Sequence, residues 1–195
     1  MDIAFLLDSS ASMSHAYTTQ SKVVEKIASQ YKLSPNGSHA SILVYSNNAQ
    51  IELILKDGAS INSVRQNLGN LPFLGLDTRL DRGLYLARLA LFVKKYGARE
   101  NVPKILYVFT DGEQSTLTEA ALAQQAKELR KLGVQIVVIA IGGAVDRDEL
   151  QTVTSSKIYY MKSFKELLNN DDLIRQMVNH THVNLREFLF RFYCS

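Results

Sequence analysis

The sequence has one cysteine, three prolines and no long uninterrupted apolar run. Because the cysteine is Cys194, next to the end of the 195 residues, an internal disulfide is excluded and stability must come from burial. A membrane-spanning helix needs about 20 apolar residues, and no stretch approaches that length, so we expect no membrane insertion. The opening residues, 1–5, also lack the basic region and cleavage site of a signal peptide.

Charge of one sign is not concentrated anywhere along the chain. The 22 Lys and Arg residues are scattered among 19 Asp and Glu residues, and the formal net charge is only +3. We therefore expect no nucleic-acid partner. The sequence also lacks internal repeats, low-complexity segments and Pro/Gly linkers, and its 46% hydrophobic and 21% charged residues are typical of one globular domain with a real core.

Short apolar runs alternate with helical patterns along the chain. Such runs, bounded by polar residues, are typical of strands buried on both faces of a parallel sheet. We predict strands at residues 3–7, 40–45, 50–55, 105–109, 134–141 and 157–161. We predict helices at residues 22–31, 80–96, 118–132 and 164–179. The alternation indicates an α/β fold, with a sheet of about six strands and helices on both faces.

The predicted last helix begins at a capping box formed by Ser163 and Glu166. We expect the domain to occupy residues 1–180, and residues 181–195 to be a C-terminal extension of unknown role. This extension carries several aromatic residues among basic ones, and its sequence indicates no particular partner.

Polar segments follow two of the predicted strands, and a third precedes a predicted helix. In open parallel sheets, the carboxyl ends of the strands form the crevice where ligands bind. The three segments offer two carboxylates and three hydroxyls, namely Asp8, Asp111, Ser10, Ser12 and Thr78. All five donors are oxygen, and no His or Cys is adjacent, which favours Mg²⁺, or alternatively Mn²⁺ or Ca²⁺, over Zn²⁺.

Alternate residues of a loop that reads Asp-x-Ser-x-Ser can converge on one point, as ligands do in other metal loops. With only two formal negative charges nearby, the ion would stay electron-poor and would favour an incoming carboxylate. The alternative is structural, because Asp and Ser after a strand are ordinary helix N-caps, and Asp-Gly is a common turn. The coincidence of all three segments at the expected positions favours the metal site.

These motifs resemble the metal-ion-dependent adhesion site (MIDAS) of the von Willebrand factor type A domain family. The matching residues are Asp8-Ser9-Ser10-Ala11-Ser12, the loop threonine Thr78, and Thr110-Asp111-Gly112. Residues 142–150 are also similar to the corresponding segment of extracellular-matrix members such as collagen type VI and matrilins. The resemblance covers roughly residues 2–180 and implies a doubly wound, mostly parallel six-stranded open sheet with one antiparallel edge strand. It further implies that Ser10, Ser12 and Thr78 bind the ion directly, and that Asp8 and Asp111 bind it directly or through water.

Two departures limit what the resemblance implies. The loop before Thr78 lacks the second threonine of many members and adds a third acid, Asp77, which can also be read as a solvated turn residue. Residues 141–148 leave too little room for the extra helix of collagen-binding integrins, so we do not expect integrin-style collagen recognition.

The resemblance implies a non-catalytic adhesion or extracellular-matrix module that uses its cation to bind a Glu or Asp carboxylate of a matrix or cell-surface protein. The alternative is an intracellular scaffold domain of the same family within a multiprotein complex. A metal-dependent hydrolase is less favoured, because it needs a general base near the metal and only His15 is close in sequence. Glycosylation sequons at Asn36 and Asn179, together with the matrix-like segment, favour a secreted protein.

Overall fold

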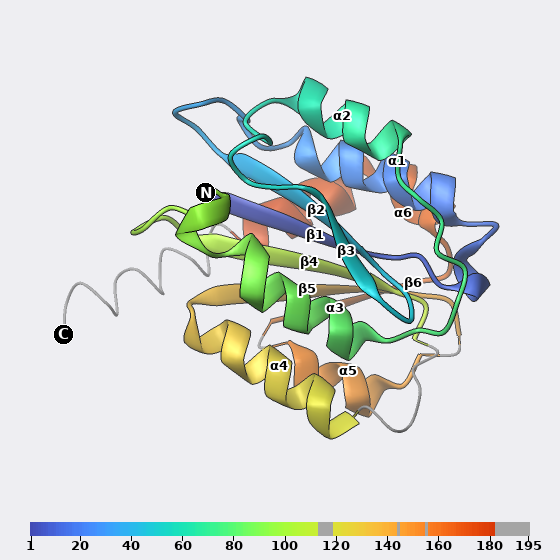
Figure 1. Ribbon diagram of the computed structural model, residues 1–195. Coiled ribbons are helices and arrows are strands. Elements are labelled where there is room, and N and C mark those ends of the chain that lie inside the picture. The colour runs from blue at the N-terminus through green and yellow to red at the C-terminus, as the bar shows by residue number, and fades with distance from the viewer. Residues whose placement is uncertain (113–118, 144, 155, 182–195) are drawn as a thin grey trace.

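The computed structural model describes residues 1–112, 119–143, 145–154 and 156–181. Six strands form one sheet in the order β3-β2-β1-β4-β5-β6 (Figure 1). The strands are β1 (Asp2–Asp8), β2 (His39–Tyr45), β3 (Ala49–Leu53), β4 (Lys104–Thr110), β5 (Val134–Ile141) and β6 (Ile158–Met161). The predicted doubly wound six-stranded sheet is confirmed.

All neighbouring strands are parallel except β2 and β3, which pair antiparallel at one edge. The antiparallel edge agrees with the family resemblance. The prediction that the edge strand runs to Leu55 is wrong, since β3 ends at Leu53 and Leu55 is buried in the turn that follows. The apolar character of Leu55 reflects that burial rather than a position in the sheet.

Side chains alternate across β1 and divide the core into two layers. Ile3 and Phe5 belong to the apolar cluster on one face, and Ala4 and Leu6 belong to the cluster on the other. One face is covered by α1 (Tyr17–Ala28), α2 (Ile61–Gly69), α6 (Phe164–Leu168) and a helix at residues 171–181, and the other by α3 (Leu80–Leu86), α4 (Glu119–Lys131) and α5 (Arg147–Val153). The strands are therefore buried on both faces, as their apolar runs indicated.

Several predicted helix limits are wrong. The first helix begins at Tyr17 rather than residue 22, and the short helices α2 and α5 were not predicted. The predicted helix at 80–96 is not continuous, because α3 passes into a π-helical segment, Ala87–Leu91, and Val93 then adopts an extended backbone with φ −112° and ψ 145°. A separate 3-10 turn, Lys94–Tyr96, follows the break. Of the predicted helix at 118–132, residue 118 lies outside the described residues.

The predicted last helix, 164–179, is also interrupted. The predicted cap at its start is present, since the Ser163 hydroxyl accepts from the Glu166 N–H at 3.2 Å, but the Glu166 carboxylate accepts from the N–H of the preceding residue, Lys162, at 2.9 Å. However, α6 ends at Leu168, and Asn170 caps a new helix through a 3.0 Å bond to the Leu173 N–H. Of the expected C-terminal extension, only Thr181 falls within the described residues.

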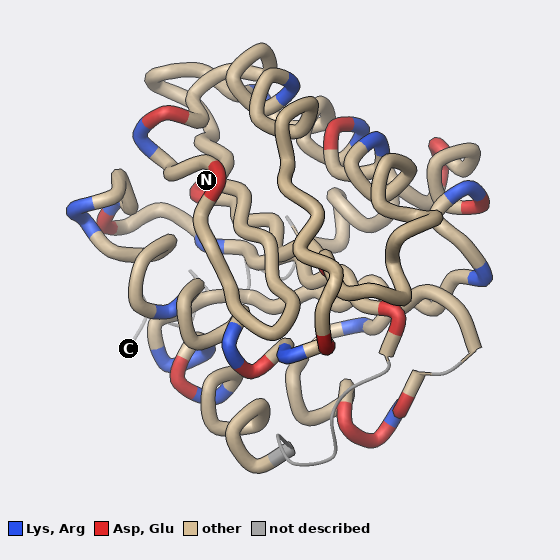
Figure 2. Tube along the Cα trace, turned by 45° about the vertical axis from the view of Figure 1, so that its right-hand side comes forward, with Lys and Arg blue, Asp and Glu red and all other residues tan. Residues whose placement is uncertain are grey.

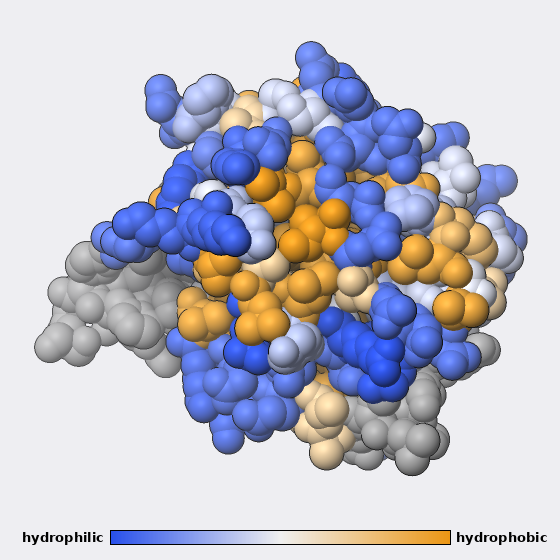
Figure 3. All heavy atoms as spheres, in the orientation of Figure 1, coloured by the Kyte–Doolittle hydropathy of each residue, from blue (hydrophilic) through white to orange (hydrophobic). Residues whose placement is uncertain are grey.

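Charged residues of both signs are distributed over the described chain. Acidic and basic residues lie interspersed along it (Figure 2), and on the face shown in Figure 3 a group of apolar side chains lies among polar ones. None of the described helices is both long and apolar enough to cross a bilayer. The central strands β1 and β4 are adjacent and parallel, so their carboxyl ends bring two of the predicted polar segments to the same edge of the sheet.

Candidate metal centre

The loop after β1 brings the side chains of alternate residues close to one another. Asp8, the last residue of β1, is fully buried, and the Ser10 N–H donates to its Oδ1 at 2.9 Å. The hydroxyl oxygens of Ser10 and Ser12 are 3.1 Å apart and share a hydrogen bond. The Asp-x-Ser-x-Ser spacing thus gathers three oxygen-bearing side chains, as the sequence led us to expect.

The carboxylate of Asp8 lies in an electrostatically unfavourable position. Burial, aided by the nearby negative charge of Asp111, raises its pKa to about 6, although hydrogen bonds from Ser10 and Tyr45 oppose the shift. The Tyr45 hydroxyl lies 3.1 Å from Asp8 Oδ2 and 3.0 Å from the Phe109 carbonyl oxygen, so its one proton is shared between two acceptors. A buried carboxylate beside a second acid is a place where a cation would be stabilised.

Ser9 holds the loop that leads to α3. Its Oγ accepts from the Leu74 N–H at 2.8 Å and donates to the Pro72 carbonyl oxygen at 3.3 Å. Its own carbonyl accepts from the Gly75 N–H at 2.8 Å. Gly75 has φ 69°, in the left-handed region where a side chain would be strained. Ser9 therefore ties residues 72–75 to the end of β1.

Further hydrogen bonds hold the same loop in place on both sides of Thr78. The Leu76 carbonyl accepts from the Ala11 N–H at 2.9 Å, and the Leu76 N–H donates to the Ser46 hydroxyl at 3.1 Å. The Arg79 N–H donates to the Ser46 carbonyl at 3.0 Å. Thr78, held between these contacts, is only 7% exposed. The loop threonine is thus fixed against the segment that carries Ser10 and Ser12.

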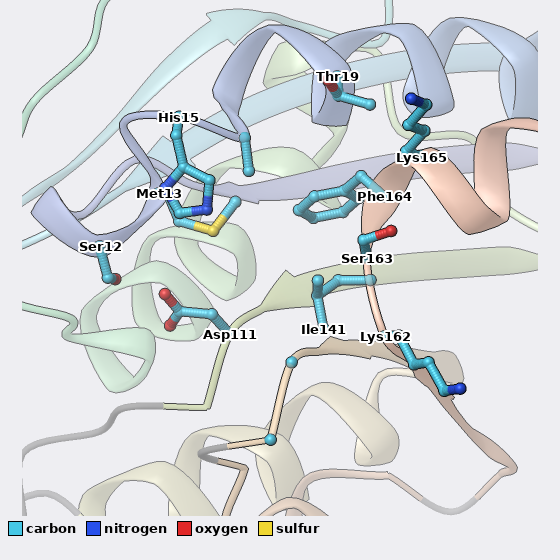
Figure 4. Close-up of a pocket in the computed structure, with 13 residues that line it drawn as sticks. Ser12, Met13, His15, Thr19, Asp111, Ile141, Lys162, Ser163, Phe164 and Lys165 are labelled. Atoms are coloured by element: carbon cyan, nitrogen blue, oxygen red, sulfur yellow. The ribbon is translucent and has the colours of Figure 1, made fainter.

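Asp111 lies directly after β4, and in the close-up its carboxylate lies on the side of the cavity occupied by Ser12 (Figure 4). The turn that follows needs a glycine. Gly112 has φ 82°, and a Cβ added there would lie 2.5 Å from the Cα of Val145. Its N–H donates to Thr110 Oγ1 at 3.1 Å. The Thr-Asp-Gly sequence therefore forms a close turn that presents Asp111 at the sheet edge.

The donor chemistry of this edge fits a hard divalent cation. Among the described residues, no group of three or more His, Cys, Asp or Glu side chains is placed to hold a metal. The side chains gathered at this edge offer hydroxyl oxygens beside two carboxylates, an oxygen-only set of the kind that suits Mg²⁺. Asp77 does not join the buried set, because it is exposed on the loop before Thr78.

A cavity of about 470 Å³ opens beside Ser12 and Asp111. Its other walls come from the turn before α1, the end of β5 and the start of α6 (Figure 4). His15 lines it and lies in the turn between the 3-10 helix Ala11–Met13 and α1. Sequence reasoning missed the β5 and α6 walls. The sequence could have indicated them, because Ile141 is the last residue of β5 and Ser163 follows the end of β6, at the same edge of the sheet.

The two sequons lie in different settings. Asn36 is exposed in a turn before β2. Asn179 is exposed on the helix at 171–181, but the sequon's Thr181 is 1% exposed and its hydroxyl donates to the Val178 carbonyl at 2.6 Å. In the folded chain, the Asn36 sequon is therefore the more open of the two.

Known proteins resemble this chain over most of its length. The model of the von Willebrand factor type A domain family matches residues 2–174. The mouse protein named von Willebrand factor A domain-containing protein 1 is 30% identical over 142 residues, which is 72% of this chain and 33% of that protein. Chicken matrilin-1 is 25% identical over 175 residues, covering 87% of this chain and 34% of its own length.

Among solved structures, proximal thread matrix protein 1 from the mussel byssus, described with a zinc-occupied MIDAS motif, superposes with a TM-score of 0.79 at 26% identity. The match covers 91% of this chain and 45% of that one. The chain thus spans about a third of the curated relatives it matches, at 33% and 34% of their lengths.

Proposed function

The chain belongs to the von Willebrand factor type A domain family, and from this premise we propose that it is a non-catalytic protein-binding module that holds one divalent cation, Mg²⁺ in preference to Mn²⁺ or Ca²⁺. The residues that would hold it are Asp8, Ser10, Ser12, Thr78 and Asp111. Similarity to matrilin-1 and to a byssal matrix protein supports a binding role in a matrix.

The observation that carries the proposal is the fully buried Asp8 beside Asp111, with the Ser10 and Ser12 hydroxyls 3.1 Å apart in the same loop. Without a cation, burial and the neighbouring acid both disfavour the charged carboxylate. The oxygen-only donor set favours Mg²⁺ over Zn²⁺, which prefers nitrogen and sulfur ligands. The zinc in the byssal relative supports a divalent site at the matching position rather than a particular metal here.

A bound Mg²⁺ would supply an electron-poor position for an oxygen ligand from outside the protein. Two carboxylates and neutral hydroxyls leave it with little compensating charge, so we propose that a Glu or Asp side chain of a matrix or cell-surface protein completes the site. On this proposal the chain works in a secreted protein, where the exposed Asn36 sequon would be available for glycosylation.

Two other functions have less support. A hydrolase would need a general base beside the cation. Among the residues that line the cavity in the described part of the chain, His15 is the one histidine. It is exposed in a turn before α1, the setting of a solvated side chain. An intracellular scaffold of the same family would share the cation site, but the matrix protein among the similar structures favours the extracellular setting.

The cation is tested by thermal unfolding of the purified chain in EDTA and in saturating Mg²⁺. A ligand at about 100 times its dissociation constant adds roughly 2.7 kcal/mol, which is about 5 to 10 °C for a domain of this size. We expect this rise for the parent and none for Asp8→Asn, which keeps the size of the side chain but removes its charge. Asp57→Asn, in the turn after β3, is the matched control and should keep the full response.

An equal response of the parent and Asp8→Asn would contradict the proposed ligand set. No response of the parent at millimolar Mg²⁺, Mn²⁺ or Ca²⁺ would contradict the cation itself.

A further inference from the structure

The cavity beside the candidate metal centre is polar at one end and apolar in the middle. Ser12 and Asp111 form the polar end. The side chains of Met13, Ile141 and Phe164 converge on the space beyond them (Figure 4). Met13 and Phe164 are almost fully buried, at 2% exposure each, so they form a closed apolar floor to the cavity and leave little of either side chain accessible. The space, about 470 Å³, exceeds what one bound ion and its water need.

A second hollow, of about 330 Å³, continues the first. The two share Gly142, Gly143 and Lys162 as lining residues. The outer hollow is also lined by Arg147 and Tyr160, whose guanidinium carbon and ring centre are 4.6 Å apart. We refer to both hollows together as the β5–β6 groove, because it runs from Asp111 past the ends of these two strands toward α5.

Beyond Asp111, the charged residues that line the β5–β6 groove are basic. Lys165 lines the inner hollow, Arg147 lines the outer hollow, Lys162 lines both, and all three are exposed. Within the described part of the chain, none of the three side chains forms an ion pair. The neighbouring Asp146 is engaged elsewhere, because its Oδ1 accepts the first N–H groups of α5 at 3.0 Å. The groove thus presents positive charge to a ligand.

We propose that the β5–β6 groove binds an extended acidic segment of the partner protein, which continues from the carboxylate that reaches the cation. An apolar side chain of that segment would occupy the cavity above the floor formed by Met13, Ile141 and Phe164, and a further carboxylate would meet Lys162 and Arg147. The proposal rests on the proposed cation site for the position of the first acid. The order of polar, apolar and basic surfaces along the groove specifies the order acid, apolar, acid in the partner.

Gly143 lines both hollows and can be substituted to test the groove. A Cβ added at Gly143 would meet no atom within 4 Å, and its φ is outside the left-handed region, so the backbone accepts a side chain there. Gly142 is unsuitable for substitution because its φ is 92°. Gly143→Leu should therefore fill the groove without disturbing the fold. Gly69→Leu is the matched control, since Gly69, on α2, also has open space around it.

The test measures fluorescence anisotropy of short labelled peptides in Mg²⁺ and in EDTA. One peptide has a single glutamate among glycines and serines. Three others add leucine one, two or three positions after the glutamate, and the best of these is then extended by a second glutamate. We expect leucine in its best position to tighten Mg²⁺-dependent binding about tenfold, as burial of one such side chain allows. Gly143→Leu should remove that gain, while Gly69→Leu should keep it.

The basic end is tested by charge reversal. Lys162→Glu should remove the gain from the second glutamate and leave the single-glutamate peptide unaffected. Lys32→Glu, at an exposed position after α1, should change neither. Methionine methyl NMR gives an independent readout, because Met13 and Met161 line the groove whereas Met177 is buried in the core away from it. The leucine peptide should shift the first two signals and leave the third unchanged.

If leucine brings no gain, or if Gly143→Leu keeps it, the groove proposal is overturned while Mg²⁺-dependent binding of the single-glutamate peptide still supports the proposed function. If no peptide binds in a Mg²⁺-dependent manner, both are overturned.

Discussion

Ser9 lies in the loop after β1, and we expect it to support the cation site by holding the neighbouring loop rather than by binding the cation. Its hydroxyl accepts from the Leu74 N–H at 2.8 Å, and its carbonyl accepts from the Gly75 N–H at 2.8 Å. Ser9→Ala should lower the free energy of unfolding by about 1 to 2 kcal/mol, because it leaves a backbone N–H without its partner. It should also weaken Mg²⁺ binding by roughly tenfold, since the loop that carries Thr78 loses an anchor. Denaturant unfolding and isothermal titration calorimetry measure the two effects.

Ser14→Ala is the control for this prediction, because Ser14 is exposed in the following turn. It should leave both quantities within experimental error of the parent. A Ser9→Ala protein that binds Mg²⁺ as tightly as the parent would show that the loop before α3 is held in place without this serine.

The final helical region consists of two elements, not one. Asn170 ends the interruption after α6 by accepting the Leu173 N–H at 3.0 Å. The helix at 171–181 then buries Ile174 and Met177 against the sheet. Asn170→Ala should lower the free energy of unfolding by about 1 kcal/mol, because a helix N-cap is lost. Chemical denaturation of the variant and the parent measures this difference.

The adjacent Asn169 provides a matched control, since it is exposed at the end of α6 and its N–H, rather than its side chain, bonds the Lys165 carbonyl at 3.2 Å. Asn169→Ala should cost less than about 0.5 kcal/mol. Equal losses for the two variants would argue against a second, separately capped helix.

Arg99 joins distant parts of the molecule at the edge of the sheet opposite the candidate site. Its Nε donates to Asp2 Oδ1 at 2.8 Å, and its terminal nitrogens donate to the carbonyls of Gly37 and Met1 at 2.7 Å each. Asp2 is fully buried. Arg99→Ala should therefore lower the free energy of unfolding by about 3 to 5 kcal/mol, because the buried carboxylate loses its charged partner and keeps the backbone N–H of residue 99, which donates to Asp2 Oδ2 at 2.7 Å. Equilibrium unfolding in urea provides the measurement.

Arg65, which pairs with Glu25 at 2.7 Å on the surface, is the control. Arg65→Ala should cost less than about 1 kcal/mol, as exposed ion pairs usually do. A similar small loss for Arg99→Ala would mean that water compensates Asp2 when the guanidinium is removed.

Across the whole molecule, the sequence predicted the sheet better than the helices. A continuous apolar run such as residues 136–141 indicates a central strand directly, because both faces of such a strand must be buried. Helix limits depend on local backbone geometry that the apolar pattern does not report. The extended backbone at Val93 and the side-chain cap at Asn170 each interrupt a pattern that reads as one helix.

The part of the candidate site that lies within one short sequence motif could be predicted from the sequence. Asp8, Ser10 and Ser12 are close in sequence, so their convergence follows from the loop spacing. The β5–β6 groove was not predictable in the same way. Met13 and Phe164 are separated by most of the chain, and each is an ordinary apolar residue until the fold brings them to one wall.

The most direct test of the cation site is the anomalous scattering of Mn²⁺ in a crystal of the chain. We predict one strong peak at the end of β1, with ligand oxygens of Ser10 and Ser12 at about 2.1 to 2.2 Å and with Asp8 and Asp111 bound directly or through water. A crystal of Asp8→Asn should lack that peak. A peak elsewhere in the parent, or none at saturating Mn²⁺, would contradict the assignment of these residues.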